Sequence, residues 1–474
     1  MGDDVAESQA AELLCRVLDA LGCRDHAVFL RRLAAHHEAL GFGPMAARPE
    51  KVSRWKRGVR PDRYTETALA DMLGVPMDHV RALGWPHWLR LALVGDRVLL
   101  TAPWTPAGAL AALDHLGRPD MDRRTALVSG SALAATALAQ WSAASPAAAV
   151  LTSGHPRLTD RSAGRIEERL TALRHMDDEI GSRETYELAR AEGHMITRLL
   201  RTRSYSESVG HRLWSAAAET SRICGWCAFD SGHTATAEAH YMVAARAAAT
   251  TRDPVVQANV FAFWAMARYS QGDTSGALDY SEEALRNAMR TGSPRMIAMV
   301  HARTARAHAK AGDARASRRA EDAAFTAYDR ANHPDDEPAC VYWVSRAELH
   351  SWAASNAADL HASRLALSHY AAISAHHQDD SYPRSQALRL SRAADAHLSL
   401  RDIDAAVHTA DQAVNLMGGI TSERGTTILT DLRLKLRTHQ QSRIVGQFLD
   451  RTDQSSVRGA PRLAGNVNTR TGLW

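Results

Sequence analysis

The stretch "YSQGDTSGALDYSEEAL", residues 269–285, places a Gly/Asp turn in front of an alanine-rich segment typical of a helix. The same order of turn and helix recurs in three other places. These are "FDSGHTATAEAHYMVAARAA" from residue 229, "AKAGDARASRRAEDAAFTA" from residue 309 and "LSLRDIDAAVHTADQAVNL" from residue 398. A phrase that returns at a nearly fixed interval indicates a repeat protein built from helices.

Small residues support this interpretation because they recur in register at two positions of each unit. In the helix before each turn, at spacings of 40, 40, 42 and 47 residues, they are Gly225, Ala265, Ala305, Ala347 and Ala394. Nineteen residues later in each unit they are Ala244, Ala284, Ala324, Ala366 and Ala413. Two helices approach closely only where their side chains are small, so each unit is predicted to be an αα-hairpin that packs on its neighbour.

These units resemble tetratricopeptide repeats, on the paired small positions and on residues 269–285. They run longer than that family's usual ~34 residues, and its early Trp and later Pro are mostly missing, which we attribute to longer helices. We expect a TPR-like α-solenoid over residues 161–440, with one degenerate hairpin at 161–204. The polar segment 441–474, with its Gly, Pro and Asn, is predicted to be a flexible tail.

Composition agrees with an all-α chain of more than one domain. At 474 residues the protein is too long for one core, and only 6% of its residues are aromatic. The net charge is +4, but residues 24–63 carry ten Lys/Arg against four Asp/Glu, a balance of +6. A basic block on a near-neutral body indicates a module that binds a polyanion.

The sequence also indicates a compartment. Five cysteines in so long a chain favour a reducing environment, and the first residues lack the basic and apolar regions of a signal peptide. No run reaches the apolar length needed to span a membrane, and the twin-arginine stretch at 122–150 is interpreted as a buried helix. We therefore expect a cytoplasmic protein.

Helical patterns divide the N-terminal half. Residues 7–22, 25–41, 49–58, 65–74 and 77–84 are predicted to form a five-helix domain over residues 1–92. Residues 93–160 are predicted to be a helical connector with helices near 106–116 and 121–142.

The segment "PEKVSRWKRGVRP", residues 49–61, combines a tryptophan with many basic residues. Wound as a helix, it turns Val52 and Trp55 to one side and Ser53, Arg54 and Arg57 to the other. An apolar back with a short polar front suits a helix in a DNA major groove. The DNA-binding residues predicted from this pattern are Arg48, Lys51, Ser53, Arg54, Lys56, Arg57 and Arg60. The alternative is an exposed basic turn with a structural tryptophan.

The surrounding sequence resembles an actinobacterial variant of the phage-repressor-type (XRE-like) helix-turn-helix domain. The matching segments are "VSRWKRGVRP" (52–61), "TALADMLGVPMDHV" (67–80) and "GWPHWL" (84–89), whereas the connection "FGPMAAR" (42–48) exceeds the family's short turn. With the repeats, the layout is similar to actinobacterial regulators with a tetratricopeptide sensor, and distantly to peptide-responsive quorum-sensing regulators of Gram-positive bacteria. The resemblance implies double-stranded DNA as a partner, a peptide or protein ligand, and a homodimer.

The concave face of the repeats is the predicted ligand groove, although solvated face residues are the simpler alternative. In the register above this face includes Arg222, Trp226, Asn259, Tyr269, Arg306, Glu348 and Asp395. One candidate occupant is the protein's own end, residues 460–474. A rival function is a repeat scaffold that binds protein partners without sequence-specific DNA binding.

Nothing in the sequence argues for catalysis, a cofactor or a metal site. Cys224 and Cys227 have the spacing of a thiol oxidoreductase, but Gly225 between them is a packing position of the repeats and no strand precedes them. His308, His350 and His397 share one repeat position and are expected to pack, since neighbouring repeats hold them too far apart to share a metal.

Overall fold

The fold is almost entirely helical. The computed structural model describes residues 2–21, 23, 25–93, 98–99, 101–117, 137–138, 141, 144, 157–331, 333, 336–376, 383–417 and 423–459. Within these residues every regular element is a helix, and one isolated bridge joins Arg157 to Ser204. The prediction of an all-α chain is therefore confirmed.

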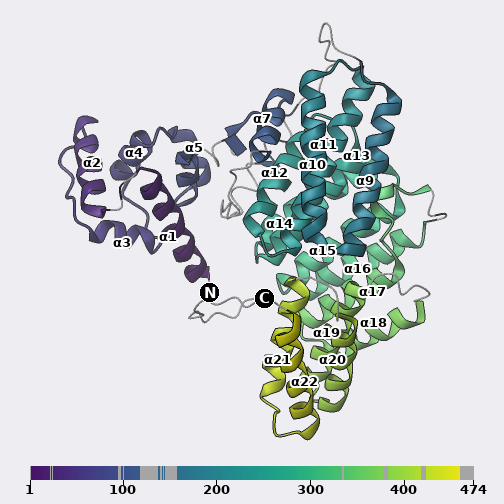
Figure 1. Ribbon diagram of the computed structural model, residues 1–474. Coiled ribbons are helices and arrows are strands. Elements are labelled where there is room, and N and C mark those ends of the chain that lie inside the picture. Colours follow the sequence, from purple (N-terminus) through teal and green to yellow (C-terminus); the bar gives the residue numbers. More distant parts are fainter. Residues whose placement is uncertain are drawn as a thin grey trace.

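The N-terminal domain contains five α-helices and one 3₁₀ helix (Figure 1). They are α1 (Gly2–Ala20), α2 (His26–Ala39), α3 (Glu50–Lys56), α4 (Arg63–Met72), α5 (Met77–Leu83) and η1 (His87–Ala92). Helix α1 packs against α3 and η1, and α2 packs against α4. Each helix expected from the sequence is present, with its ends shifted by a few residues.

A buried carboxylate ties this domain together. Glu66 of α4 accepts a 3.0 Å hydrogen bond from Trp88 Nε1, and its other oxygen accepts bonds of 3.0 and 2.7 Å from Arg60. Because Glu66 is only 3% exposed, these bonds compensate for the loss of its hydration. The contacts link the segment after α3 to α4 and η1, and so fix the position of α3.

In the described part of the connector the well-defined helix is α7 (Pro106–Leu116). Thr105 caps its N-terminus by accepting from the Gly108 amide, and α7 packs against helices α10 and α12 of the repeats. The expected helix at 106–116 is thus confirmed. The one expected at 121–142, within the twin-arginine stretch, lies almost wholly outside the described residues.

The C-terminal body is a succession of helix pairs, stacked from α9 to α22 in Figure 1. Their bounds are α9 (Asp160–Ile180), α10 (Ser182–Thr202), α11 (Glu207–Asp230), α12 (Thr234–Ala249), α13 (Pro254–Ser270), α14 (Thr274–Thr291), α15 (Pro294–Lys310), α16 (Ala314–Tyr328), α17 (Arg346–Asp359), α18 (Ser363–His376), α19 (Pro383–Ser399), α20 (Ile403–Met417), α21 (Glu423–Arg437) and α22 (Arg443–Gly459). The five predicted hairpins are the pairs from α11/α12 to α19/α20.

The repeated turn phrase has a local physical cause. Gly272 and Gly312 adopt positive φ angles of 83° and 80°, which glycine tolerates without strain. The aspartate that follows each one caps the next helix: Asp273 accepts from the Gly276 amide and Asp313 from the Ala316 amide, both at 2.9 Å. These two hairpins therefore turn at a left-handed glycine and start their second helix on a capping carboxylate.

The small residues in register are all buried, as expected for close helix contacts. At Gly225 of α11 an added Cβ would lie 2.8 Å from the ring of Tyr241 on α12. Real Cβ atoms essentially never come so close to a neighbouring atom. The spacing of small residues thus reflects helix packing within the hairpins.

The predicted flexible tail from residue 441 is wrong for its first half. Helix α22 packs against α20 and α21, and its Val445 and Phe448 are fully buried. The apolar residues at 444, 445, 448 and 449 form one helix face, whereas the prediction was dominated by the polar residues that follow. Residues 460–474 lie outside the described part of the chain.

Candidate functional site

Helix α3 has the two faces that the sequence predicts. Val52 is fully buried and Trp55 is 4% exposed, with its ring centroid 6.5 Å from that of Trp85. Ser53, Arg54 and Arg57 are exposed. The short helix is therefore anchored by its apolar side and presents a polar strip to solvent.

The flanking basic residues differ in how open they are. Arg48, just before α3, is exposed, while Lys51 and Lys56 are half-buried. Lys56 Nζ lies 3.2 Å from His26 Nε2 at the start of α2. The cations next to the polar strip are thus partly held by the domain, a geometry suited to point-charge contacts with phosphates.

Arg60 has a structural partner that the sequence did not reveal. Its Nε and Nη2 both donate to Glu66, so its side chain supports the buried carboxylate described above. Among the predicted DNA-binding residues, Arg60 is therefore the one whose side chain supports the fold of the N-terminal domain through these two hydrogen bonds.

The segment joining α2 to α3 is long, since it covers residues 40–49. Its Phe42 ring packs against Tyr64 of α4 with centroids 5.2 Å apart. Tyr64 is 57% exposed and its neighbour Arg63 is exposed too. The basic pattern in the sequence did not point to these two residues, although they follow α3 closely and add an aromatic ring and a cation to the same part of the domain.

The predicted ligand groove of the repeats centres on a buried ion cluster. Glu219 of α11 accepts hydrogen bonds from Arg174 Nε at 2.8 Å, Arg222 Nη2 at 2.9 Å and Asn259 Nδ2 at 3.1 Å. Burial alone would raise the pKa of Glu219, but the charges of Arg222 and Arg174 outweigh it and lower the pKa to about 2. The cluster joins α9, α11 and α13.

Other residues of the predicted groove make similar bonds between hairpins. Arg306 of α15 donates to Asp359 of α17 at 2.7 Å and lies over the Tyr269 ring at 5.9 Å. The remaining pairs, in chain order, are Trp226 with Asp177 at 2.8 Å, Glu348 with Arg389 at 3.7 Å and Asp395 with Lys435 at 2.7 Å. These side chains join one hairpin to another.

A segment of the chain itself fills the centre of this face. Residues Pro338–Val344, here called the strap, include the 3₁₀ helix η3 (Ala339–Val341), which contacts α9 and α15. Val341 and Val344 are fully buried, and the Tyr342 hydroxyl donates to the Arg174 carbonyl at 3.2 Å and to Asp178.

Beneath the strap lies a cation among aromatic rings. The Arg303 guanidinium of α15 is 4.4 Å from the Phe263 centroid and 5.8 Å from that of Trp343 in the strap. The prediction that Arg222 and Asn259 face an open ligand groove is therefore wrong. Both are at most 5% exposed, because hairpin contacts and the strap occupy this face.

The environments of Cys224, Cys227 and His350 are those of residues packed between helices. Burial raises the pKa of Cys224 to about 12 and that of Cys227 well above its ordinary value, which disfavours the thiolate that an oxidoreductase requires. His350 Nδ1 lies 3.1 Å from His369 Nδ1, within one hairpin. Among the described residues no three His, Cys, Asp or Glu side chains are grouped as metal ligands would be.

Comparisons with known proteins add little. No family model matches the sequence, and no curated protein matches it. The crystal structure of BtubC (BKLC) from P. vanneervenii is similar at 13% identity and a TM-score of 0.36, over 60% of this chain and 97% of that chain. A similarity this weak supports no conclusion about function.

No helix within the described ranges is long and apolar enough to cross a membrane.

Proposed function

We propose that this protein is a DNA-binding transcriptional regulator, with an N-terminal helix-turn-helix domain and a C-terminal TPR-like repeat body. The observation that carries the proposal is the polar strip formed by Ser53 and Arg54 of α3 and by Arg57, which directly follows the helix. The buried Val52 and Trp55 anchor the other side of α3. Arginine can form two hydrogen bonds to a guanine edge, and the surrounding +6 block supplies charge for the phosphates.

The strip is the part of the domain that would enter the major groove. Arg54 and Arg57 are the proposed base contacts, and Lys51, Lys56 and Arg48 the proposed phosphate contacts. The repeat body would sense a ligand and change operator affinity by favouring one placement of the N-terminal domain over another. Ligand sensing by a repeat domain is what the resemblance to regulators with a tetratricopeptide sensor implies.

A selection experiment tests the proposal and requires no known operator. The full-length protein is incubated with a randomised duplex library, and retained DNA is sequenced over several rounds. We expect one enriched motif for the wild type and none for Arg54→Ala/Arg57→Ala. Arg81→Ala is the matched control, because it removes an exposed arginine of the same domain but on α5. A double variant that enriches the same motif with undiminished affinity would refute the assignment.

The rival function, a scaffold that binds protein partners without reading DNA sequence, is favoured by the long segment 40–49 between α2 and α3. It predicts no enriched motif from the wild type. It also predicts only weak DNA retention that disappears as salt is raised, because nonspecific binding is almost wholly electrostatic.

A further inference from the structure

A cavity of about 720 Å³ lies where the connector helix α7 meets the first repeat helices. Its lining includes the C-terminal end of α7, at residues 113–117, and one face of α10. Residues of α11 and α12, among them Cys224 and His240, also line it. Its volume lies within the range of roughly 300–1,000 Å³ that is typical of small-molecule sites.

The charged lining of this cavity is predominantly positive. Arg190, Arg198 and Arg201 all come from α10, and among the described residues that line the cavity the only carboxylate, Asp114 of α7, pairs with Arg201. Arg190 Nη1 lies 3.9 Å from Glu187, which is outside the lining. The side chain of Arg198 is exposed and bonds to no residue in the described part of the chain. Among the described lining residues, positive charges therefore outnumber negative ones.

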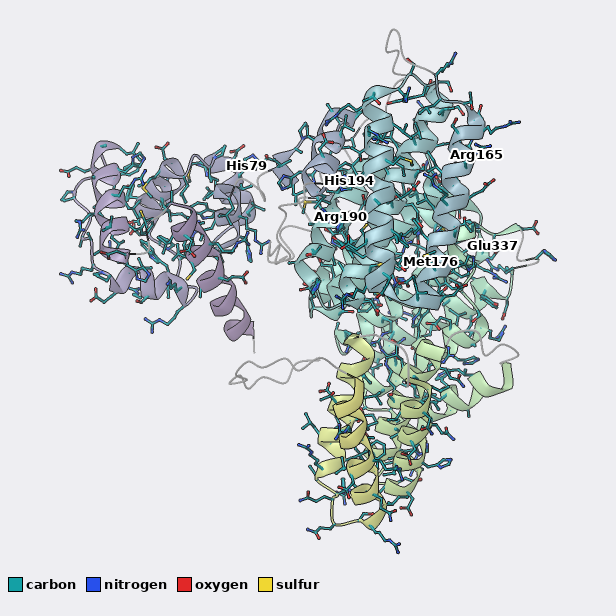
Figure 2. All side chains as sticks on the ribbon, viewed as in Figure 1. His79, Arg165, Met176, Arg190, His194 and Glu337 are labelled. Atoms are coloured by element: carbon teal, nitrogen blue, oxygen red, sulfur yellow. The ribbon has the colours of Figure 1, made fainter. Side chains whose placement is uncertain are left out.

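Two histidines add neutral hydrogen-bonding groups. Burial, with a smaller effect of Arg190, lowers the pKa of His240 to about 3, and the same two causes lower the pKa of His194. His240 Nε2 lies 3.1 Å from the Tyr186 hydroxyl, whereas its buried Nδ1 has no partner among the described residues. Figure 2 labels Arg190 and His194 together on α10.

The connector contacts the repeats at the cavity. An added Cβ at Gly117, just after α7, would lie 2.8 Å from Cε1 of His194, so the end of α7 rests directly on this ring. Leu113 and Leu116 of α7 and Met195 of α10 supply apolar surface to the same lining. A molecule in the cavity would thus touch both the connector and the repeats.

We propose that this cavity binds a small organic anion, with its charged group on Arg198 and Arg190 and its apolar part against Leu113 and Leu116. Guanidinium groups bind carboxylates and phosphates through paired, charge-assisted hydrogen bonds. That such a ligand acts as the effector of a regulator rests on the proposed function, whereas its binding does not. A ligand held between α7 and α10 favours the docked position of the connector.

Fluorescence titration of the full chain with 1-anilinonaphthalene-8-sulfonate tests the site, because this dye is an apolar ring system with one anionic group. We expect saturable binding to the wild type and at least a tenfold loss of affinity in Arg198→Glu. Arg183→Glu is the matched control, since it makes the same charge reversal at an exposed arginine of the same helix outside the cavity. N-phenyl-1-naphthylamine, which lacks the sulfonate, is expected to bind at least tenfold more weakly than the anionic dye.

A second variant tests whether the dye binds in this cavity, independently of the charge of Arg198. His194→Trp fills the cavity from its wall and is expected to abolish dye binding, with an unchanged circular dichroism spectrum. Dye affinity that is unchanged in both Arg198→Glu and His194→Trp would overturn the proposal, as would equal affinity for the neutral dye. Arg54→Ala/Arg57→Ala is expected to bind the dye normally, so a failure of DNA binding is distinguishable from a failure of this site.

Competition identifies the anionic group. Displacement of the dye by phenyl phosphate but not by benzoate would assign a phosphate ligand, and the reverse would assign a carboxylate. Displacement by neutral benzyl alcohol at the same concentration as either anion would contradict an anion site.

Discussion

Trp55 shows how a residue next to a proposed DNA contact serves the fold. It is 4% exposed and packs near Trp85, so its truncation leaves a cavity between α3 and the rest of the domain. We expect Trp55→Ala to destabilise the N-terminal domain by about 3–5 kcal/mol. Hydrogen exchange of the full chain should then show faster exchange in α1 and α3.

The matched control for this prediction is Arg57→Ala, which lies on the exposed side of the same segment. It is expected to change the free energy of unfolding by no more than about 0.5 kcal/mol. Normal exchange protection in Trp55→Ala together with lost DNA binding would mean that this tryptophan is an interface residue.

Glu219 is expected to make the stability of the repeats depend on pH in the acidic range. Its pKa of about 2 in the folded chain lies below its ordinary value of 4.5, so the ionised carboxylate contributes stability that is complete above about pH 4.5. This contribution is lost as the pH falls from there towards 2. At neutral pH, Glu219→Gln is expected to cost roughly 3–5 kcal/mol, because it leaves the buried Arg222 without its carboxylate.

Urea unfolding of the wild type and Glu219→Gln at several pH values checks this prediction. The difference in the free energy of unfolding is expected to shrink steadily between pH 5 and pH 2.5. A difference that stays constant over this range would show that Glu219 is not the group that titrates.

Alanine substitution at two helical glycines of the repeats is expected to change the free energy of unfolding in opposite directions. An alanine at Gly225 would press on the buried Tyr241 ring at 2.8 Å, and overpacking of this kind costs about 1–3 kcal/mol. At Gly164 of α9 the nearest such atom is Arg212 Nη2 at 3.5 Å, an ordinary contact. Gly164→Ala should therefore gain up to about 1 kcal/mol from helix propensity.

Thermal unfolding of the two variants distinguishes a packing glycine from a tolerated one. Gly225→Ala is expected to lower the midpoint and Gly164→Ala to leave it unchanged or raise it. Equal shifts in both variants would argue that the small residues in register do not set the approach of α11 and α12.

We expect the buried valines of the strap to hold it against the repeats. Val341 is fully buried, so Val341→Asp places a carboxylate where it cannot be hydrated and is expected to release Pro338–Val344 from α9 and α15. Cys340, which is 7% exposed and whose pKa burial raises to about 12, should then react with a thiol reagent.

The rate of Cys340 modification, located by mass spectrometry, measures strap release. Leu365→Asp is the control, because it adds the same charge at a position of α18 that is 42% exposed. A Cys340 that stays as unreactive in Val341→Asp as in the control would show that the strap is held by contacts beyond its valines.

The proposed function predicts that the full-length protein is a homodimer. One short recognition helix covers few base pairs, and regulators of the repressor class read two half-sites about one DNA turn apart. Light scattering at micromolar concentration is expected to give twice the mass of the 51.7 kDa chain. A monomer that binds its selected DNA motif with full affinity would contradict this expectation.

Sequence patterns alone predict the helical class, the hairpin register and the two faces of α3. These features depend on local chemistry: small residues at fixed intervals, left-handed glycines before capping aspartates, and Val52 and Trp55 spaced for one side of a helix. Such signals lie within a few tens of residues, so they can be read along the chain. The helical segment 106–116 was predictable for the same reason.

Which polar residues are exposed depends on contacts that form only when the chain folds. Arg222 and Asn259 belong to the face that the sequence predicts as a ligand groove, but both are buried and both donate hydrogen bonds to Glu219, which lies 40 positions from Asn259. Arg60 and Glu66 are close in sequence, but the donor to the other carboxylate oxygen, Trp88, lies 22 positions further along the chain. The cavity at α7 likewise combines segments more than 120 residues apart. Burial and partner choice are properties of the assembled chain, because a side chain's hydration depends on every segment that packs over it.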